Sequence, residues 1–142
     1  MKLPGPTGSA RALAFDTDQR LFASGADGTV HQWDLGQGRE IRRFGGPRGE
    51  VYRLALSPDG ESLAGASGEQ ALFRWRLVDG TAISSPTTAL IRALAYSPDG
   101  ALVAVASSTP AIALFPSVGG PPRFLEGHAN GVLSIAFSPD AR

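Results

Sequence analysis

Short apolar segments that end in turns recur along the chain at a nearly constant interval. Four of them align, and each runs from an apolar stretch into a turn closed by aspartate: residues 12–18, 53–59, 93–99 and 134–140. The closing aspartates are separated by 41, 40 and 41 residues. A fixed period of this length is typical of a protein built from repeated supersecondary units, each packed on its neighbours.

Each repeat predicts four short strands. The first strand is apolar on both faces, as in the segment Val-Leu-Ser-Ile-Ala-Phe, and such a run indicates a strand that is covered on both sides. The turn after it reads Ser-Pro-Asp-Gly at residues 57–60 and 97–100, a sequence that favours a tight turn. We expect first strands at residues 10–15, 51–56, 91–96 and 132–137, second strands at 20–24, 62–66 and 101–106, third strands at 29–34, 71–76 and 111–115, and fourth strands at 39–44, 81–85 and 122–125.

A helix is the competing prediction for residues 89–96, because alanine, leucine and arginine are good helix formers. The equivalent residues 51–56 are rich in residues that favour strands. Equivalent positions of a repeat share one structure, so we predict a strand here as well.

Aromatic residues keep the same period, with Trp33, Trp75 and Phe115 lying 15 or 16 residues after the aligned aspartates. Residues 21–34 contain Asp-Gly-Thr and end in Trp-Asp, and this stretch resembles the signature of a WD-repeat blade. The pair Gly127-His128 resembles the Gly-His opener of the same family.

This resemblance covers residues 1–142 and implies an all-β fold. The expected architecture is a β-propeller of four-stranded antiparallel blades, incomplete because it has three blades plus the first strand of a fourth. We expect blade 1 at about residues 9–45, blade 2 at about 50–86, blade 3 at about 90–126 and the start of blade 4 at about 131–142.

The WD-repeat resemblance also implies a hydrogen-bonded network of His, Ser or Thr, Asp and Trp within a blade. Carried over to this sequence, its members are Ser24, Asp27, Trp33, Trp75 and His128. The blades depart from the family pattern, since the opener of blade 1 lacks histidine and Arg76 stands where blade 2 should have aspartate. We therefore expect the blades to depend on packing more than on this network.

Composition argues against several classes of partner. Lysine plus arginine and aspartate plus glutamate number 13 each, so no net charge favours nucleic acid or an anionic membrane surface. The longest apolar run, residues 101–106, is far too short to span a bilayer, and no signal peptide is evident. We expect a soluble, cytoplasmic protein.

The sequence predicts no catalytic residue, cofactor site or metal site. There is no cysteine, and the two histidines, His31 and His128, lie in different repeats without a flanking cluster of ligands. We interpret His31 as a side chain on the surface of a blade, and Asp16 and Asp18 as turn residues. The glycine-rich residues 5–9 lack the Lys-Ser/Thr ending of a phosphate-binding loop.

One local cluster of arginines has two interpretations. It lies on and after the first outer strand and consists of Arg39, Arg42, Arg43, Phe44 and Arg48. Charges protect an edge strand from pairing with other sheets, and this is the interpretation that we favour. The alternative is a patch that binds an acidic partner, because aromatic residues and arginine are enriched at interfaces.

The function implied by the family is a non-catalytic scaffold that holds a protein or peptide partner. The alternative is a fragment of a longer protein whose activity, for example that of an enzyme domain, lies outside these residues, so that the blades are only structural. A propeller needs about four or more blades to close. Open blade edges therefore make self-association a further expectation.

Overall fold

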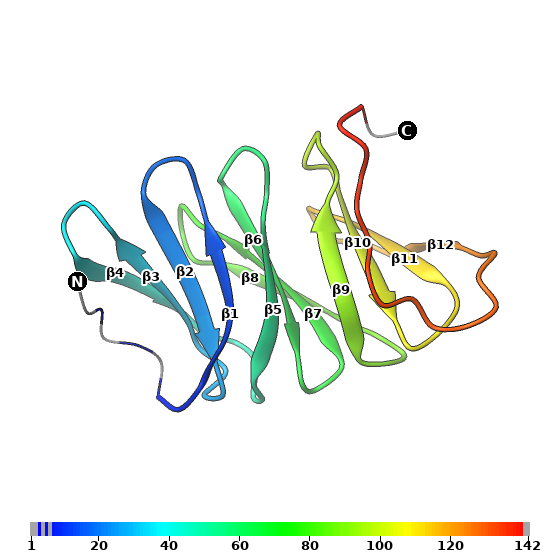
Figure 1. Ribbon diagram of the computed structural model, residues 1–142, viewed down its shortest axis with the longest axis horizontal. Coiled ribbons are helices and arrows are strands. Elements are labelled where there is room, and N and C mark those ends of the chain that lie inside the picture. Colours follow the sequence, from blue (N-terminus) through cyan, green and yellow to red (C-terminus); the bar gives the residue numbers. More distant parts are fainter. Residues whose placement is uncertain (1–2, 4, 6, 141–142) are drawn as a thin grey trace.

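Three four-stranded antiparallel sheets make up the described part of the chain. The computed structural model describes residues 3, 5 and 7–140, and within them it contains strands and turns but no helix. Each sheet is a meander in which strands that follow one another in sequence lie side by side. We call the three sheets blades 1, 2 and 3 (Figure 1). The predicted all-β fold of four-stranded blades is thereby confirmed.

The bounds of the strands agree with the predicted ones to within one residue at either end. They are β1 Ala10–Phe15, β2 Arg20–Gly25, β3 Val30–Asp34 and β4 Arg39–Phe44 in blade 1; β5 Val51–Leu56, β6 Ser62–Ser67, β7 Ala71–Arg76 and β8 Ala82–Pro86 in blade 2; and β9 Ile91–Tyr96, β10 Leu102–Ser107, β11 Ile112–Pro116 and β12 Arg123–Leu125 in blade 3. The segment for which a helix competed is the strand β9.

The blades stack face to face, and their first strands form the closest contacts between them. β5 packs on β1 and β2 of blade 1, and β9 packs on β5 and β6 of blade 2. Figure 1 shows β1, β5 and β9 running side by side, while the fourth strands lie farthest from them within each sheet. First strands are covered on both faces wherever a blade has a neighbour on each side.

The first strand of each blade has a small face and a bulky face. Side chains alternate along a strand, so Ala14 points to one side of β1, and Leu13 and Phe15 point to the other. Ala14 packs against the core shared with blade 2, as do Leu54 and Leu56 of β5. Small side chains of one blade thus lie against bulky side chains of the blade that follows it in the sequence.

A hydrophobic core lies between each pair of neighbouring blades. The first contains Phe22, Val30 and Phe44 of blade 1 with Val51, Leu63 and Trp75 of blade 2. In the second core, Ala55, Ala64 and Ala66 of blade 2 lie against Leu94, Tyr96 and Val103 of blade 3. The aromatic residues predicted at the repeat spacing, Trp33, Trp75 and Phe115, are all buried.

The fourth blade departs from expectation. Residues 132–137 form no strand, because no described residue supplies the second strand with which they would pair. The segment nevertheless lies against blade 3, where Val132 N donates to Ser107 O over 2.9 Å. Val132, Ile135 and Phe137 are half-buried, and Leu133 and Ala136 are exposed. Figure 1 shows this segment in red as it rises near β10.

Glycine 65 provides a test of the core between blades 1 and 2. A Cβ atom on Gly65 would lie 2.8 Å from Cζ3 of Trp75 and 3.1 Å from Cγ1 of Val51, both of which are buried. We expect Gly65→Ala to lower the free energy of unfolding by about 1–3 kcal/mol, the usual cost of overpacking a core. Urea unfolding followed by tryptophan fluorescence measures the change.

Gly68→Ala is the matched control for this substitution. A Cβ atom on Gly68 meets only ordinary contacts, of which the nearest is Glu50 Cγ at 3.6 Å. We expect this variant to be as stable as the original chain or slightly more stable, by about 0.4–1 kcal/mol, since alanine restricts the unfolded state. Equal destabilisation by the two variants would contradict the packing argument.

Candidate functional site: a cleft along blade 2

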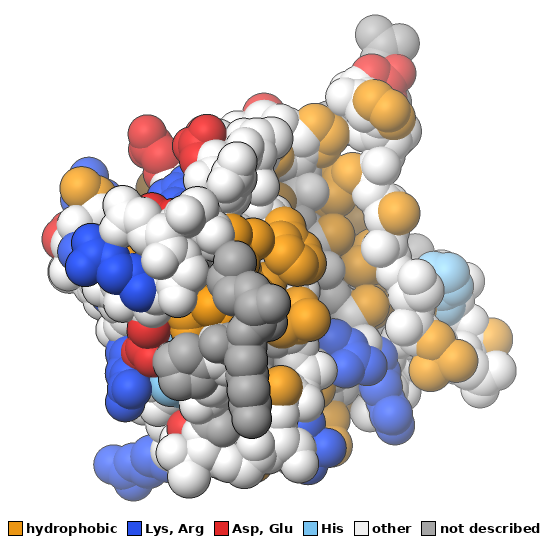
Figure 2. Space-filling view, turned by 60° about the vertical axis from the view of Figure 1, so that its left-hand side comes forward, with side chains coloured by type: hydrophobic (Ala, Val, Ile, Leu, Met, Phe, Trp, Pro, Cys, Tyr) orange, Lys and Arg blue, Asp and Glu red, His pale blue; other side chains and the backbone are white. Residues whose placement is uncertain are grey.

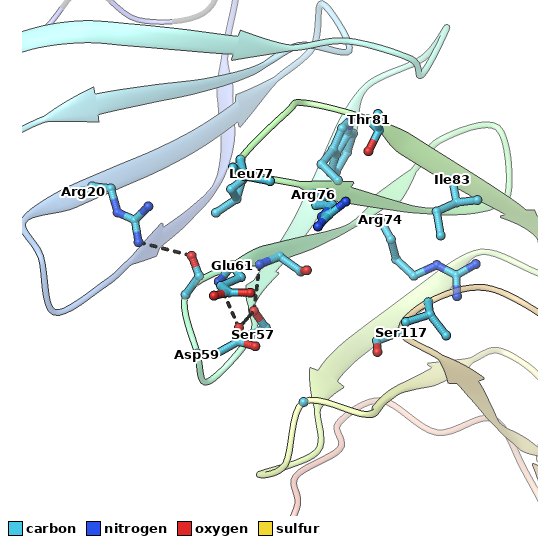
Figure 3. Close-up of a pocket in the computed structure, with 16 residues that line it drawn as sticks. Arg20, Ser57, Asp59, Glu61, Arg74, Arg76, Leu77, Thr81, Ile83 and Ser117 are labelled. Carbon is cyan, nitrogen blue, oxygen red and sulfur yellow. Dashed lines mark hydrogen bonds between the residues drawn. The ribbon is translucent and has the colours of Figure 1, made fainter.

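A cleft of about 860 Å³ runs along blade 2 at the edge that carries the Ser-Pro-Asp-Gly turns (Figure 3). Its walls come from the turn after β5, from the end of β7, from β8 and from the turn after β11, and Arg20 of blade 1 reaches its rim. The residues that line it are Arg20, Ser57, Asp59, Gly60, Glu61, Ser62, Arg74, Trp75, Arg76, Leu77, Val78, Thr81, Ile83, Gly100, Ser117 and Val118.

The turn at residues 57–60 forms the floor at one end of the cleft. Hydrogen bonds from the side chains of this turn hold it in place. Ser57 Oγ donates to Asp59 Oδ1 over 2.6 Å and accepts from the Ser62 backbone N over 2.9 Å. Gly60 has a φ of +71°, a conformation that glycine adopts without strain. Ser97, Asp99 and Gly100 repeat the arrangement in blade 3.

Blade 1 builds the same turn from other residues. Asp16 Oδ1 accepts from the backbone N of Asp18 and of Arg20, so the predicted role of Asp16 as a turn residue agrees with its contacts. Gln19 takes the left-handed position, with a φ of 58°. The Arg20 side chain donates to the carbonyl of Gly60 over 3.2 Å and so connects this turn to that of blade 2.

Arg74 forms an inner wall of the cleft and joins blade 2 to blade 3. Its side chain is buried, it donates to Pro116 O and to Ser85 Oγ, and its guanidinium lies 5.8 Å from the centre of the Phe115 ring. Burial lowers the pKa of Arg74 from its ordinary value, and the neighbouring Tyr96 opposes this change. Both terminal nitrogens of the guanidinium donate within the protein, while the buried Nε has no partner among the described residues, so Arg74 is a structural residue of the wall.

The outer lips of the cleft are apolar and exposed. Val78 and Ile83 of blade 2 are 72% and 42% exposed, and Val118 of blade 3 is 87% exposed. Figure 3 shows the Arg76 head group near the middle of the opening. Its Nη1 lies 3.5 Å from Asp79 Oδ2, and both side chains are largely open to solvent. The lips therefore combine apolar side chains with an exposed cation.

The residues of the expected blade network are placed differently from one another. Ser24 and Trp33 point to opposite faces of blade 1, and Ser24 Oγ donates to Val51 O of blade 2 over 2.7 Å. Asp27 accepts from the backbone N of Thr29 and of Thr7, each over 3.0 Å. Ser24 therefore connects two blades, whereas Asp27 holds a turn within one.

The interpretation of His31 as a surface side chain is wrong. His31 is 3% exposed, its ring stacks on Trp33 at 5.5 Å, and its Nδ1 lies 3.3 Å from Glu40 Oε1. On the other side of the ring, Nε2 lies 3.8 Å from Asp27 Oδ2. Burial alone would raise the pKa of Asp27, but the hydrogen bonds from Thr29 and Thr7 and the nearby His31 lower it overall.

The remaining two members of the expected network lie apart from this group. Trp75 Nε1 donates to Gly45 O, in the connection between blades 1 and 2, over 2.8 Å. His128 is exposed. The structure thus brings Asp27, His31 and Trp33 together and leaves Trp75 and His128 elsewhere.

The arginine cluster is not one continuous surface. Arg42 donates to Leu77 O of blade 2. Arg43 pairs with Glu40 on the opposite face of β4. Phe44 is buried in the core between blades 1 and 2, so the alternative interpretation, in which it belongs to a partner patch, is wrong for this residue. Arg39, which donates to Gln37, and Arg48 are exposed.

Consecutive four-stranded meanders that pack face to face through their first strands are the blades of a β-propeller. The family model described as "WD domain, G-beta repeat" matches residues 1–34 and 119–142. Together with the Trp-Asp signature and the relatives described next, this match over part of the chain supports a WD-repeat family, to which the chain is similar.

Several curated proteins are similar to the chain. A WD repeat-containing protein, SL1-17 of Schistosoma mansoni, is 29% identical over 122 residues, which are 84% of this chain and 40% of that protein. Protein HIR1 of Mycosarcoma maydis is 29% identical over 97% of this chain and 15% of its own length. Transducin beta-like protein 3 of Rattus norvegicus is 29% identical over 66% of this chain and 12% of its own length. The chain therefore spans less than half the length of these relatives.

Residues 3, 5 and 7–140 contain no group of three or more His, Cys, Asp or Glu side chains that could hold a metal ion. The same residues include no helix of the length and apolar character needed to cross a membrane.

The turns that border the cleft predict a dependence of stability on pH. The hydrogen bond from Ser57 Oγ and a backbone N–H bond lower the pKa of Asp59, and the same contacts in blade 3 lower that of Asp99. A carboxylate with a lowered pKa in the folded state stabilises the fold above its ordinary pKa, and this contribution is lost as the pH falls toward the folded value. We expect the urea concentration at the midpoint of unfolding to decrease as the pH is lowered from about 6 to about 3.

The double variant Asp59→Asn/Asp99→Asn should be less stable than the original chain near neutral pH and should lose less stability on acidification. Glu126→Gln, which removes an exposed carboxylate outside these turns, serves as the control and should retain the original pH dependence. A pH dependence that both variants share would show that other groups cause the acid sensitivity.

Proposed function

We propose that this chain is a non-catalytic scaffold for protein interaction, and that the cleft along blade 2 binds an extended segment of a partner protein. The observation that carries the proposal is the exposure of three apolar side chains, Val78, Ile83 and Val118, on the lips of one cleft. Single exposed apolar residues are ordinary on protein surfaces, but a group of them around a concave site is typical of an interface.

The charge at the cleft favours a particular kind of partner segment. Arg76 is exposed, and its Nη1 lies 3.5 Å from the carboxylate of Asp79, which is itself open to solvent. Arginine is enriched at interfaces and can form two parallel hydrogen bonds with a carboxylate. A segment with apolar side chains next to an acidic residue would fill the lips and pair with Arg76.

A second role concerns the arginines on and after β4. For Arg39, Arg42, Arg43 and Arg48 we propose protection of an edge strand in place of a partner patch. β4 is the last strand of its sheet, and Arg42 and Arg43 are engaged with Leu77 O and Glu40. Charged side chains along such an edge oppose pairing with another sheet.

A structural role in a larger protein is the second candidate function. It is favoured by Leu13 and Phe15 on β1, which are 58% and 62% exposed although their equivalents in blades 2 and 3 pack against another blade. In that case the activity lies in other parts of a longer protein. The chain covers 40% or less of the relatives described above, which is consistent with such a role.

Selection of peptides from a random library displayed on phage, with the immobilised chain as the target, tests the cleft. We expect selected peptides to carry apolar residues beside Asp or Glu. Val78→Asp and Arg76→Glu should each weaken their binding by at least about tenfold, or about 1.4 kcal/mol, as measured by calorimetry.

Ile41→Asp is the matched control, because Ile41 is an apolar residue of β4 that is 44% exposed and lies outside the cleft. This variant should bind the selected peptides as the original chain does. Equal loss of binding in all three variants, or failure of the library to yield any peptide that Val78→Asp weakens, would contradict the proposed site.

A further inference from the structure

β8 is the outer edge of blade 2 and borders the cleft. It is the last strand of its sheet, and residues 82–84 are exposed. Side chains alternate along a strand, so Ile83 lies on the same face as Thr81. Arg76, whose backbone N donates to Thr81 O, lies on this face as well, and all three residues line the cleft (Figure 3). β8 thus forms a wall of the cleft at a free edge of the sheet.

The hydrogen bonds between β7 and β8 follow a regular register. Arg76 N donates to Thr81 O over 2.8 Å near the hairpin turn. At the other end of the pair, Thr87 N donates to Gln70 O over 2.8 Å. The pairing between these two points is continuous, without a register shift. Because bonded and non-bonded pairs alternate in an antiparallel ladder, every second residue of β8 bonds to β7.

The remaining residues of β8 present their backbone groups to the open side of the sheet. Ile83 and Ser85 are the residues that bond to β7. The N–H and C=O groups of Ala82 and Ser84 therefore point outward. Pro86 follows at the next outward position and has no N–H. The edge thus offers a short row of backbone donors and acceptors that ends at this proline.

The other fourth strands carry protection that β8 lacks. The pairing of β4 with β3 contains a register shift, and β4 bears Arg39, Glu40, Arg42 and Arg43. Figure 2, in which blade 1 comes forward, shows charged side chains of both signs along the left-hand edge of the molecule. β12 is only three residues long. β8 has neither a register shift nor a charged side chain, although irregular pairing, charge and short length are the features that keep an edge from accepting another strand.

We propose that the partner segment binds as an added strand on β8, with its backbone bonded to Ala82 and Ser84 and the side chains of one face directed into the cleft. This inference rests on the proposed function and specifies how the segment is held. In strand addition, backbone hydrogen bonds supply affinity and alternate side chains supply specificity.

The cleft face of β8 determines the side chains of the added strand. The turn after β11 comes close to Ile83, since a Cβ atom on Gly119 would lie 3.5 Å from Ile83 Cδ1, and the neighbouring Val118 is 87% exposed. A residue opposite Ile83 therefore meets an apolar surface. A residue opposite Thr81 lies two strand spacings, about 10 Å, from Arg76, a distance that an arginine and a glutamate side chain span together. The occupant is an extended segment in which an acidic residue stands two positions from an apolar one.

The phage-selected peptides are the probe for this arrangement, and we expect them to carry the acidic and apolar residues two positions apart. Ser84→Pro removes an outward N–H and leaves the bonds to β7 in place, and proline is tolerated at such edge positions. This variant should bind the peptides at least about tenfold more weakly in calorimetry. Ser84→Ala is the matched variant, because it keeps the N–H, and it should bind as the original chain does.

Amide hydrogen exchange followed by NMR examines the edge without any substitution, and it decides the question if Ser84→Pro fails to fold. With a selected peptide bound, the amides of Ala82 and Ser84 should exchange at least about tenfold more slowly. The amides of Ile83 and Ser85, which bond to β7 already, should change much less. Methylation of the peptide's backbone nitrogens, one at a time, should abolish binding at alternate positions only.

Three results would overturn the added strand, and they distinguish it from the cleft itself. Peptides that Val78→Asp weakens and that a folded Ser84→Pro binds normally would support the cleft and contradict the strand. A library that yields no peptide would contradict both. A rise in the mass of the chain alone above 14.7 kDa in light scattering, abolished by Ser84→Pro, would show that the edge pairs with a second copy instead.

Discussion

The whole array depends on one repeated contact, in which two bulky side chains of a first strand lie against the side of the preceding blade that carries alanine. Leu54 and Leu56 lie against the side of blade 1 that carries Ala14, and Leu94 and Tyr96 lie against the side of blade 2 that carries Ala55. Because side chains alternate along a strand, a single residue of slippage would place the bulky residues on the wrong side. The repeated pattern therefore fixes the register of each first strand, the direction in which blades stack and the identity of the face that remains open.

Packing along the first and second strands leaves the outer strands farther from the neighbouring blade, and long side chains cross the resulting space. Arg42 of β4 donates to Leu77 O at the end of the third strand of blade 2. Arg74 of β7 donates to Pro116 O at the end of the third strand of blade 3. Two arginines thus make the same kind of connection to successive blades. Arg74 forms an inner wall of the cleft along blade 2, together with apolar residues such as Leu77 and Ile83.

The strands could be predicted from the sequence because period, turn residues and apolar runs all report local structure. The side-chain environments that were missed depend on what packs against a blade. His31 lies two residues from Trp33, so strand alternation places both side chains on one face, and this signal was sufficient to predict that His31 is buried. Its pairing with Glu40 required the register of β4, which the sequence does not contain. Phe44 was likewise assigned to a surface from its charged neighbours, although the alternation along β4 turns it into the core.

Residues 132–140 show which features of a repeat form from its own residues and which features need a neighbouring strand. Ser138 Oγ donates to Asp140 Oδ1 over 2.7 Å, as Ser57 does to Asp59, so this contact of the turn forms without a hairpin around it. Val132, Ile135 and Phe137 also turn toward blade 3, because an apolar face gains from burial whether or not the strand is paired. Residues 132–137 lack a ladder of backbone hydrogen bonds, since such a ladder needs a second strand. The first strand of a repeat can therefore lie against the blade before it without a strand ladder of its own.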